Sequence, residues 1–315
     1  MAVVSVVKLS ELEGATRIDA EYYRRDIINL KDVIQKCKFK VVRFGKIVEH
    51  GYRVVYWSTK IIPRSEMKND DVFFLQATNI DETFPYIRSE EMGGVWHKDW
   101  EDYPEGRIKI GELLIEVKGK AEKVALVPND FPRNTLVSGS LYKALIKDIE
   151  PEYVLVYLLS KYGKGFRDRL KTNLLVPFVN KKDLYNIPIV ILPSSERKLI
   201  KGLYLDAYKH FKSSEKLYNQ AENLLLEELG LEDFKPKYEL SYTANLSQAF
   251  SAHRLDAEYF QPVYHKLIKY LKDNFEVKPI KTFILDFQKG IEVGSENYQE
   301  EGKPFIRVSN LSIHG

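Results

Sequence analysis

The spacing of apolar positions divides the chain into a β-rich stretch that is framed by helices. Helical spacing of Ile27, Leu30, Val33 and Ile34 predicts a first helix at residues 20–36. Five segments rich in valine, isoleucine, leucine and phenylalanine follow, and turn-forming Gly, Pro, Asn and Asp bound them. We predict strands at residues 40–48, 72–78, 107–117, 123–127 and 135–146.

The segment after these strands changes between helix and interrupted extended chain. Pro151, at an early helical position, predicts a helix at residues 151–160. Proline interrupts the apolar segments 176–179 and 187–191, so we predict short edge strands or extended chain there. These elements together predict an α+β fold, in which a globular domain combines a mixed β-sheet with helices.

The longest regular element is a helix predicted at residues 196–229. Ser194 or Ser195 provides the N-cap, Gly230 provides the C-cap, and only Gly202 interrupts the pattern. At 1.5 Å per residue this helix is roughly 50 Å long. Such a length predicts a coiled-coil-like spacer or a dimerisation arm. The alternative is a long helix that folds back on its own domain.

A seven-residue repeat supports helix pairing in this segment. Large apolar residues form neighbouring rows beside small residues, as in a close antiparallel helix pair. The small residues are Ala207, Ser214 and Ala221. The large residues, which we predict to bind a partner helix or subunit, are Leu203, Tyr204, Phe211, Leu217, Tyr218, Leu224 and Leu225.

The chain also contains an internal repeat. The segment RIDAEYY at 17–23 recurs as RLDAEYF at 254–260, with five of seven positions identical. Further along, FLQATNI at 74–80 recurs in the same order as FIRVSNL at 305–311. Two ordered matches are hard to attribute to chance. We therefore expect one complete module and the start of a second, which is cut short at Gly315.

Composition narrows the possible classes of protein. A length of 315 residues allows two domains. The single cysteine, Cys37, excludes an internal disulfide framework and fits a reducing, cytoplasmic setting. The six histidines show no paired metal spacing, so we expect no metal site. No segment approaches the roughly 20 apolar residues of a membrane span, and the apolar start lacks the features of a signal peptide.

Positive charge is concentrated in one region, although the net charge is only +3. Residues 158–182 contain seven basic residues and one acid, Asp168. A local excess of this kind can neutralise phosphates, although a solvated surface has the same composition. The basic residues are Lys161, Lys164, Arg167, Arg169, Lys171, Lys181 and Lys182.

Four groups of residues resemble, in order, the specificity subunits of type I restriction-modification systems. They are LQATNI at 75–80 with its repeat, GELLI at 111–115 leading through Gly119 to KVALV at 123–127, IEPEYV at 149–154, and DLYNIPI at 183–189 leading to PSSER at 193–197. The resemblance covers residues 17–230, after which a second unit begins as expected. One departure is Lys120-Ala121-Glu122, where the family usually has small polar residues after Gly119.

The resemblance implies a non-catalytic, DNA-binding subunit. Residues 1–193 would form a target-recognition domain, residues 194–231 the long spacer or dimerisation helix, and residues 232–315 a linker and the start of a second domain. Each domain would bind half of a split double-stranded DNA target. The helices would set the spacing and bind two methyltransferase subunits, joined by a restriction subunit, with self-dimerisation as a further option. S-adenosylmethionine, ATP and Mg²⁺ would be bound by those partners.

DNA contacts require Arg, Lys, Asn and Gln side chains on a rigid scaffold. Residues 51–60 mix aromatic, basic and hydroxyl side chains between strands, where function is common; alternatively this is a hairpin with Tyr56 and Trp57 in the core. The predicted DNA contacts are Tyr52, Arg53, Tyr56, Trp57, Lys60, Gln76, Lys118, Lys120, Lys123, Lys164, Arg167, Arg169, Lys171, Lys181 and Lys182.

The repeated residues are interpreted as framework, because two domains that bind different half-targets should differ in their contacts. Asn79 recurs as Asn310 and is interpreted as a turn residue. Asp19 is interpreted as the N-cap of the first helix, with Arg17 and Glu21 fixing its start; docking of a partner is the alternative.

Two other functions fit parts of the sequence. Asp102, Glu116 and Lys118 superficially match the acid…acid-x-Lys pattern of Mg²⁺-dependent nucleases. A purely structural dimerisation protein would use residues 196–229 alone. Methylation by the chain itself is disfavoured, because the sequence lacks an Asn-Pro-Pro-aromatic motif and a glycine-rich turn after a strand.

Overall fold

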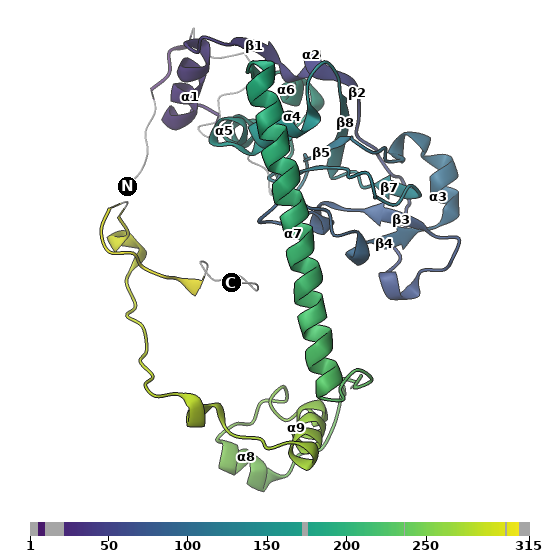
Figure 1. Ribbon diagram of the computed structural model, residues 1–315, viewed down its shortest axis with the longest axis vertical. Helices are drawn as coiled ribbons and strands as arrows, with labels where there is room; N and C mark the ends of the chain where they lie inside the picture. Colours follow the sequence, from purple (N-terminus) through teal and green to yellow (C-terminus); the bar gives the residue numbers. More distant parts are fainter. Residues whose placement is uncertain (1–5, 10–21, 172–175, 236, 300, 309–315) are drawn as a thin grey trace. The chain divides into compact units, whose positions relative to one another are not determined.

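The computed structural model describes residues 6–9, 22–171, 176–235, 237–299 and 301–308 (Figure 1). The chain divides into two compact units, Met1–Tyr218 and Asn219–Gly315, which are described separately. The boundary lies inside the long helix α7 (Ser194–Glu228), so the predicted three-part division at residues 193 and 231 stays a prediction.

The first unit contains three small sheets among its described residues. A two-stranded antiparallel sheet pairs β1 (Lys40–Arg43) with β9 (Pro188–Ile191). A four-stranded antiparallel sheet has the order β2 (Val48–Tyr52), β8 (Leu141–Ile146), β5 (Leu113–Glu116), β6 (Val124–Leu126). A three-stranded sheet places β3 (Val72–Leu75) antiparallel to β4 (Gly93–Val95) and parallel to β7 (Thr135–Val137).

Strand β5 lies between the two main parts of the core. Successive side chains of a strand point to opposite faces. Leu113 and Ile115 accordingly pack in one cluster with Phe44 and Leu158, whereas Leu114 packs in the other cluster with Leu75. All six side chains are almost completely buried. Because both faces of β5 are covered, its sequence shows a continuous apolar run rather than alternation.

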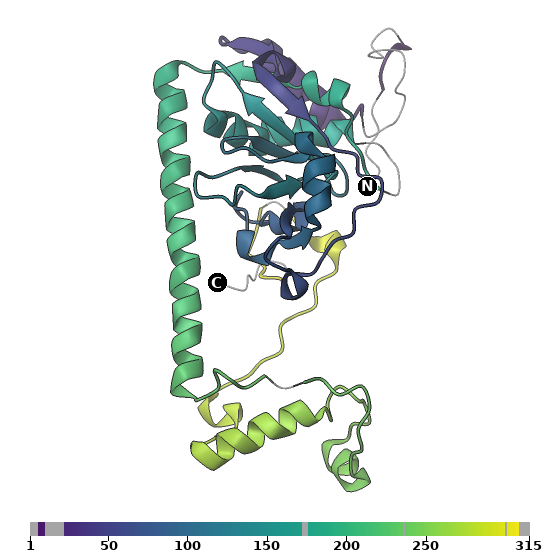
Figure 2. The same ribbon diagram turned by 90° about the vertical axis from the view of Figure 1, so that its right-hand side faces the viewer.

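Short helices cover the sheets. They are α1 (Arg25–Gln35), α2 (Phe44–Ile47), α3 (His97–Asp102), α4 (Pro151–Leu159), α5 (Lys161–Leu170) and α6 (Lys181–Tyr185). Helix α4 contacts β6, and α5 packs between α4 and α1. The Ser160 hydroxyl accepts the Gly163 amide at 3.3 Å, which caps the start of α5. Helix α7 runs beside the sheets of this unit (Figure 2).

The mixed α+β fold with a long helix is confirmed, but several element boundaries differ from the prediction. The predicted strand 40–48 is β1 followed by α2, because Phe44 turns into the core and is fully buried. The predicted strand 107–117 is shortened to β5. Helix α5 was not predicted, because its many charges hide its apolar face. Proline-bounded β9 pairs with a single strand, β1, as an edge strand should.

Among its described residues, the second unit contains the end of α7 and two further α-helices, α8 (Leu246–Ala252) and α9 (Pro262–Asn274). Gly230 adopts a left-handed conformation (φ 61°), and its amide bonds to the Glu227 carbonyl at 2.9 Å. The C-cap predicted at Gly230 is therefore confirmed. The Tyr270 hydroxyl of α9 donates to the carbonyls of Leu229 and Gly230, both at 3.0 Å, which attaches α9 to this helix end.

The second copy of the repeated charged segment lies in a turn before α9. Arg254 forms a two-point ion pair with Asp256 (2.7 and 2.9 Å), whose Oδ1 also accepts the Tyr259 amide at 3.1 Å. The N-cap of α9 is Gln261 instead, so the capping interpretation is wrong for this copy. Arg17, Asp19 and Glu21 of the first copy lie outside the described residues, and α1 begins only at Arg25.

Candidate nucleic-acid interface

The 51–60 loop follows β2 and is fixed to the first unit at several points. Val54 is buried in the core. Arg53 Nε donates to the Gly139 carbonyl at 2.7 Å, and its guanidinium lies 5.0 Å from the centre of the Phe178 ring. At the other end, Thr59 Oγ1 donates to Asp99 Oδ1 at 2.8 Å. These contacts give the loop a rigid base.

Tyr56 is one of these fixed points rather than a surface contact. Its hydroxyl donates to the Val137 carbonyl at 2.7 Å, and its ring packs edge-on against Phe74 and Tyr103. Burial, together with the nearby Asp99 carboxylate, raises the pKa of Tyr56 above its ordinary value, so the hydroxyl stays a donor. The core interpretation therefore holds for Tyr56, and the predicted DNA contact by this side chain is wrong.

Trp57 has the opposite environment, since its side chain is 87% exposed. Its backbone amide is held by the Tyr103 hydroxyl at 3.3 Å, which leaves the indole in solvent. The exposed Lys60 follows, and Tyr52 precedes the loop at 38% exposure. A large aromatic side chain that projects from a fixed backbone beside a cation is suited to contact with bases and phosphates. The core alternative is therefore wrong for Trp57.

A second exposed tryptophan, which the sequence interpretation missed, belongs to the same surface. Ile62, two residues after Lys60, pairs with Gly94 in an isolated antiparallel bridge, and Gly94 lies two residues before Trp96. Trp96 is 52% exposed at the start of α3. The same helix carries the exposed acids Glu101 and Asp102, so the candidate surface is bounded by negative charge on this side.

Gln76 and Asn79 form a turn after β3. Asn79 Oδ1 accepts the Gln76 amide at 2.9 Å, and the Gln76 side chain caps the amide of Asn79 in return. Asn79 is buried, and its interpretation as a turn residue is confirmed. Because the Gln76 side chain takes part in this turn, the predicted contact of Gln76 with DNA would require its hydrogen bond to Asn79 to break.

The three lysines predicted after β5 differ in exposure. Lys118 and Lys120 are exposed, with Lys120 Nζ 3.5 Å from Glu82 Oε1. Lys123 is mostly buried, and its ammonium donates to the Ile80 carbonyl at 2.5 Å. Lys118 and Lys120 stay predicted phosphate contacts. Lys123 instead ties β6 to the segment after β3, so its predicted DNA contact is wrong.

The arginines of the basic cluster point inward. Arg167 is 3% exposed and donates to the carbonyls of Glu122 (2.9 Å), Leu158 (3.3 Å) and Ala121 (3.4 Å). Burial lowers the pKa of Arg167 to about 10, which still leaves it charged at neutral pH. Arg169 is also buried, and it donates to the Tyr22 carbonyl at 2.9 Å. The predicted DNA contacts by these two arginines are wrong, because their guanidinium groups hold the fold together.

The lysines of this cluster divide into two groups. Lys164 Nζ and Lys171 Nζ both pair with Asp168, at 2.7 and 2.8 Å. Lys181 and Lys182, at the start of α6, are exposed, and Lys181 Nζ lies 5.1 Å from the centre of the Tyr185 ring. Among the predicted contacts of this cluster, α6 therefore offers the most accessible positive charge.

Glu116, the central residue of the nuclease alternative, has a structural role. It is buried, and its Oε2 accepts the amides of Glu122 (2.9 Å) and Lys123 (3.2 Å). The left-handed Gly119 (φ 106°) lets this turn pass over the carboxylate, because a Cβ there would lie 2.9 Å from Oε1. Within the described part of the chain, no group of three His, Cys, Asp or Glu residues could hold a metal ion.

Helix α7 has an occupied part and an exposed part. Tyr204 is buried, and Phe211 stacks on Phe84 of the same unit at 5.0 Å. Tyr204 and Phe211 therefore cannot bind a partner in the way that we predicted. For this part of α7, the alternative prediction of a helix that packs on its own domain holds. The predicted partner-binding residues that remain exposed are Leu203, Leu217, Tyr218, Leu224 and Leu225.

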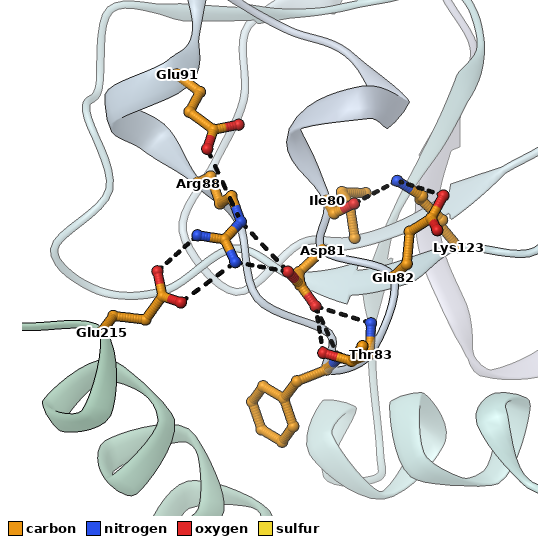
Figure 3. A network of polar contacts seen from close by, with 9 residues as sticks. Ile80, Asp81, Glu82, Thr83, Arg88, Glu91, Lys123 and Glu215 are labelled. Carbon is orange, nitrogen blue, oxygen red and sulfur yellow. Dashed lines mark hydrogen bonds and ion pairs between the residues drawn. The ribbon is translucent and has the colours of Figure 1, made fainter. Parts of the chain in front are cut away.

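Two buried ionic contacts were also missed by sequence interpretation. Lys143 is 3% exposed and pairs with Glu112 at 3.1 Å, while donating to the Arg107 carbonyl at 2.6 Å. Arg88 connects Asp81 to Glu215 of α7 (Figure 3). Glu112 and Lys143 are 31 residues apart, and Arg88 and Glu215 are 127 residues apart, so no local pattern reveals these two pairs.

No protein-family model matches the chain, and no curated protein sequence matches it either. Among solved structures, a chain from work on complex assembly and conformational transition of the type I R-M system is similar at TM-score 0.40 and 16% identity, over 66% of this chain and 52% of its own. The type I restriction-modification S subunit from M. genitalium is similar at TM-score 0.42 and 13% identity, over 85% and 59%.

The HsdS subunit from Thermoanaerobacter tengcongensis is similar at TM-score 0.35 and 14% identity, over 60% of this chain and 45% of its own. The chain thus spans about half the length of these structures. Its structural neighbours are specificity subunits of type I restriction-modification systems. None of the described helices is long and apolar enough to cross a membrane.

Proposed function

We propose that this chain is a sequence-specific DNA-binding subunit of a type I restriction-modification complex. Its first unit binds one half of a bipartite target, and α7 docks methyltransferase subunits. The observation that carries the proposal is the 51–60 loop, in which a fixed backbone projects Trp57 and Lys60 into solvent from a module that is joined directly to a 35-residue helix.

The DNA contacts follow from the exposed members of the predicted set. Trp57 and Tyr52 provide aromatic contacts, and Lys60, Lys118, Lys120, Lys181 and Lys182 neutralise phosphates. The buried members, Tyr56, Arg167 and Arg169, support this surface from inside. Sequence discrimination would come from polar side chains of the same loop and its neighbours against base edges in the major groove.

The partner contacts follow from the exposed apolar residues of α7. Leu203, Leu217 and Leu224 lie at multiples of seven residues from one another, with His210 at the intervening position, and the three leucines remain exposed. Such a row is suited to a second helix, from a methyltransferase subunit or from a second module. In this proposal the chain itself is not catalytic. The methyltransferase and restriction subunits bind S-adenosylmethionine, ATP and Mg²⁺, and they carry out the reactions.

The experiment measures binding of the full chain to a random-sequence DNA duplex over a range of salt concentrations, with and without a type I methyltransferase subunit. Each neutralised phosphate should contribute a slope of about −0.9 to log K against log salt. We expect a slope equivalent to several phosphates. A slope near zero in both samples would contradict the proposal and would favour a purely structural dimerisation protein.

The nuclease alternative is tested by the same duplex with Mg²⁺ added. No cleavage by the chain alone is expected, because Glu116 is held by backbone amides inside the turn. Cleavage that is abolished by Glu116→Ala, in a variant that keeps its thermal stability, would overturn the recognition-only proposal.

A further inference from the structure

A hairpin at residues 81–88 contacts helix α7 across the first unit. Its turn is fixed by Asp81, whose Oδ1 accepts the Thr83 amide and hydroxyl, both at 2.7 Å, and the Phe84 amide at 3.1 Å. The Asp81 amide closes the hairpin by donating to the Tyr86 carbonyl at 2.9 Å. The hairpin is therefore a rigid unit that holds Phe84 and Tyr86 in place.

The two aromatic side chains of this hairpin pack against three on α7. Phe84 stacks with Tyr204 (6.0 Å between ring centres, 12° between planes) and with Phe211 (5.0 Å, 20°). Tyr86 contacts Tyr208 at 5.4 Å and Phe211 at 5.2 Å. Residues three and four apart lie on one helix face, so these rings engage two successive turns of α7. Contact over two turns fixes both the position and the rotation of the helix.

Arg88 adds an ionic contact at the end of the same hairpin (Figure 3). Its guanidinium donates to Glu215 of α7 at 2.6 and 3.2 Å, and to Asp81 Oδ2 at 2.7 and 3.2 Å. The three side chains are only 13–20% exposed. A planar guanidinium that bonds to two carboxylates at once defines a geometry that a lysine ammonium does not reproduce.

The hairpin and the 51–60 loop are attached to neighbouring strands. β3 ends at Leu75 shortly before the hairpin, and Leu75 pairs with Val137 of β7. The Val137 carbonyl in turn accepts the Tyr56 hydroxyl of the loop. A short series of hydrogen-bonded elements therefore connects the loop that carries Trp57 to the face of α7 around Phe211.

We propose that the 81–88 hairpin is a positioning clamp, which holds the 51–60 loop at a fixed distance and angle from α7. This inference rests on the proposed function. If the loop binds one half of a target and α7 sets the spacing between the halves, the clamp determines which spacing the protein accepts. Phe84, Arg88 and Glu215 are positioning residues, since they act on DNA recognition only through the placement of the loop.

The test measures a distance within the full chain by electron spin resonance of two spin labels. The labels are attached at Ser58→Cys in the loop and Lys216→Cys on α7, both exposed positions, in a Cys37→Ser background. A narrow distance distribution is expected for the otherwise unchanged chain. In Phe84→Ala/Glu215→Ala the distribution is expected to widen about two-fold, as the local contacts open. Lys209→Ala, an exposed change on the same helix, is expected to leave it narrow.

Two further measurements keep the outcomes distinct. Arg88→Lys retains the charge and serves as a milder variant if the double variant fails to fold, with a smaller widening expected. An unchanged distribution in both clamp variants, or a broad distribution before any clamp change, would overturn the clamp. Affinity for a random-sequence duplex is expected to stay within about two-fold in folded clamp variants, because the loop is intact. Absence of DNA binding by the unchanged chain would instead count against the proposed function and leave the distance result in place.

Discussion

The 51–60 loop and helix α5 have similar compositions but opposite arrangements. Both mix basic and aromatic residues, and both were predicted to contact DNA. In the loop the backbone is fixed and Trp57 projects into solvent at 87% exposure. In α5 the exposed face is made of lysines, whereas Arg167 is 3% exposed and bonds to three backbone carbonyls. Composition therefore locates charge along the chain, but the position within an element decides whether that charge is accessible.

The position of Arg167 explains its burial. Gly163, Phe166, Arg167 and Leu170 follow the i, i+3, i+4, i+7 spacing of one helix face, and all four are buried. Gly163 is required there because a Cβ would lie 2.2 Å from the Tyr157 carbonyl oxygen. The buried cation is stabilised by hydrogen bonds to three backbone carbonyls and by the carboxylates of Asp168, Glu116 and Glu122.

The largest expected effect comes from removing this buried cation. Arg167→Ala should lower the free energy of unfolding by about 2–4 kcal/mol, because it leaves buried carbonyls without donors and opens a cavity. Lys161→Ala removes the same charge from an exposed position of α5 and should change stability by less than about 0.5 kcal/mol. Urea denaturation followed by circular dichroism measures both. If both substitutions changed the free energy of unfolding by equally small amounts, Arg167 would be as accessible to solvent as the exposed residues of the loop.

A smaller effect on stability, but a larger one on binding, is expected in the loop. Trp57→Ala should weaken duplex binding about ten-fold, which corresponds to about 1.4 kcal/mol. Its free energy of unfolding should change by less than about 0.5 kcal/mol, since the indole is exposed. Fluorescence anisotropy with a labelled duplex measures the affinity, and Trp57→Phe should retain part of it. If the unchanged chain binds DNA and Trp57→Ala binds it with the same affinity, the DNA interface lies elsewhere on the molecule.

Elements with a strong apolar pattern or clear caps were predictable from the sequence. β6, α4 and α7 lie close to the predicted ranges, because apolar runs, Pro151 and Gly230 mark them. The single strand predicted at residues 135–146 is instead two strands, β7 and β8, which belong to different sheets. α2 was missed because Phe44 and Ile47 follow a strand-like run of valines. For α2, tertiary packing rather than local preference decides which secondary structure forms.

The candidate site was predictable only in part, and for a related reason. The loop was found because aromatic and basic residues between strands are a local signal. Whether each side chain points outward depends on contacts far along the chain, such as the Tyr56 hydroxyl with Val137 or Arg88 with Glu215. The bridge between Ile62 and Gly94 likewise joins residues that are 32 positions apart. Such contacts have no counterpart in local spacing.

The smallest expected effect concerns Asp168, which holds two lysines of α5 in structural ion pairs. Burial would raise the pKa of Asp168, but hydrogen bonds from Lys164 and Lys171 outweigh it, so the pKa lies below the ordinary value of 3.8. A carboxylate with a lowered pKa stabilises the fold above its ordinary pKa, and this contribution is lost as the pH falls through the folded value. Asp168→Asn should therefore cost about 1 kcal/mol at pH 7, allowing for partial exposure.

The cost of Asp168→Asn should shrink as the pH is lowered from 7 towards 3, because the carboxylate of the unchanged chain then becomes protonated as well. Urea denaturation of both chains across this range, in the absence of DNA, measures the difference. Asp99→Asn provides the comparison in the loop region, where the carboxylate accepts the Thr59 hydroxyl rather than a cation. A cost for Asp168→Asn that did not change with pH would mean that Lys164 and Lys171 are not bound by a carboxylate in solution, which would leave them free to contact phosphates.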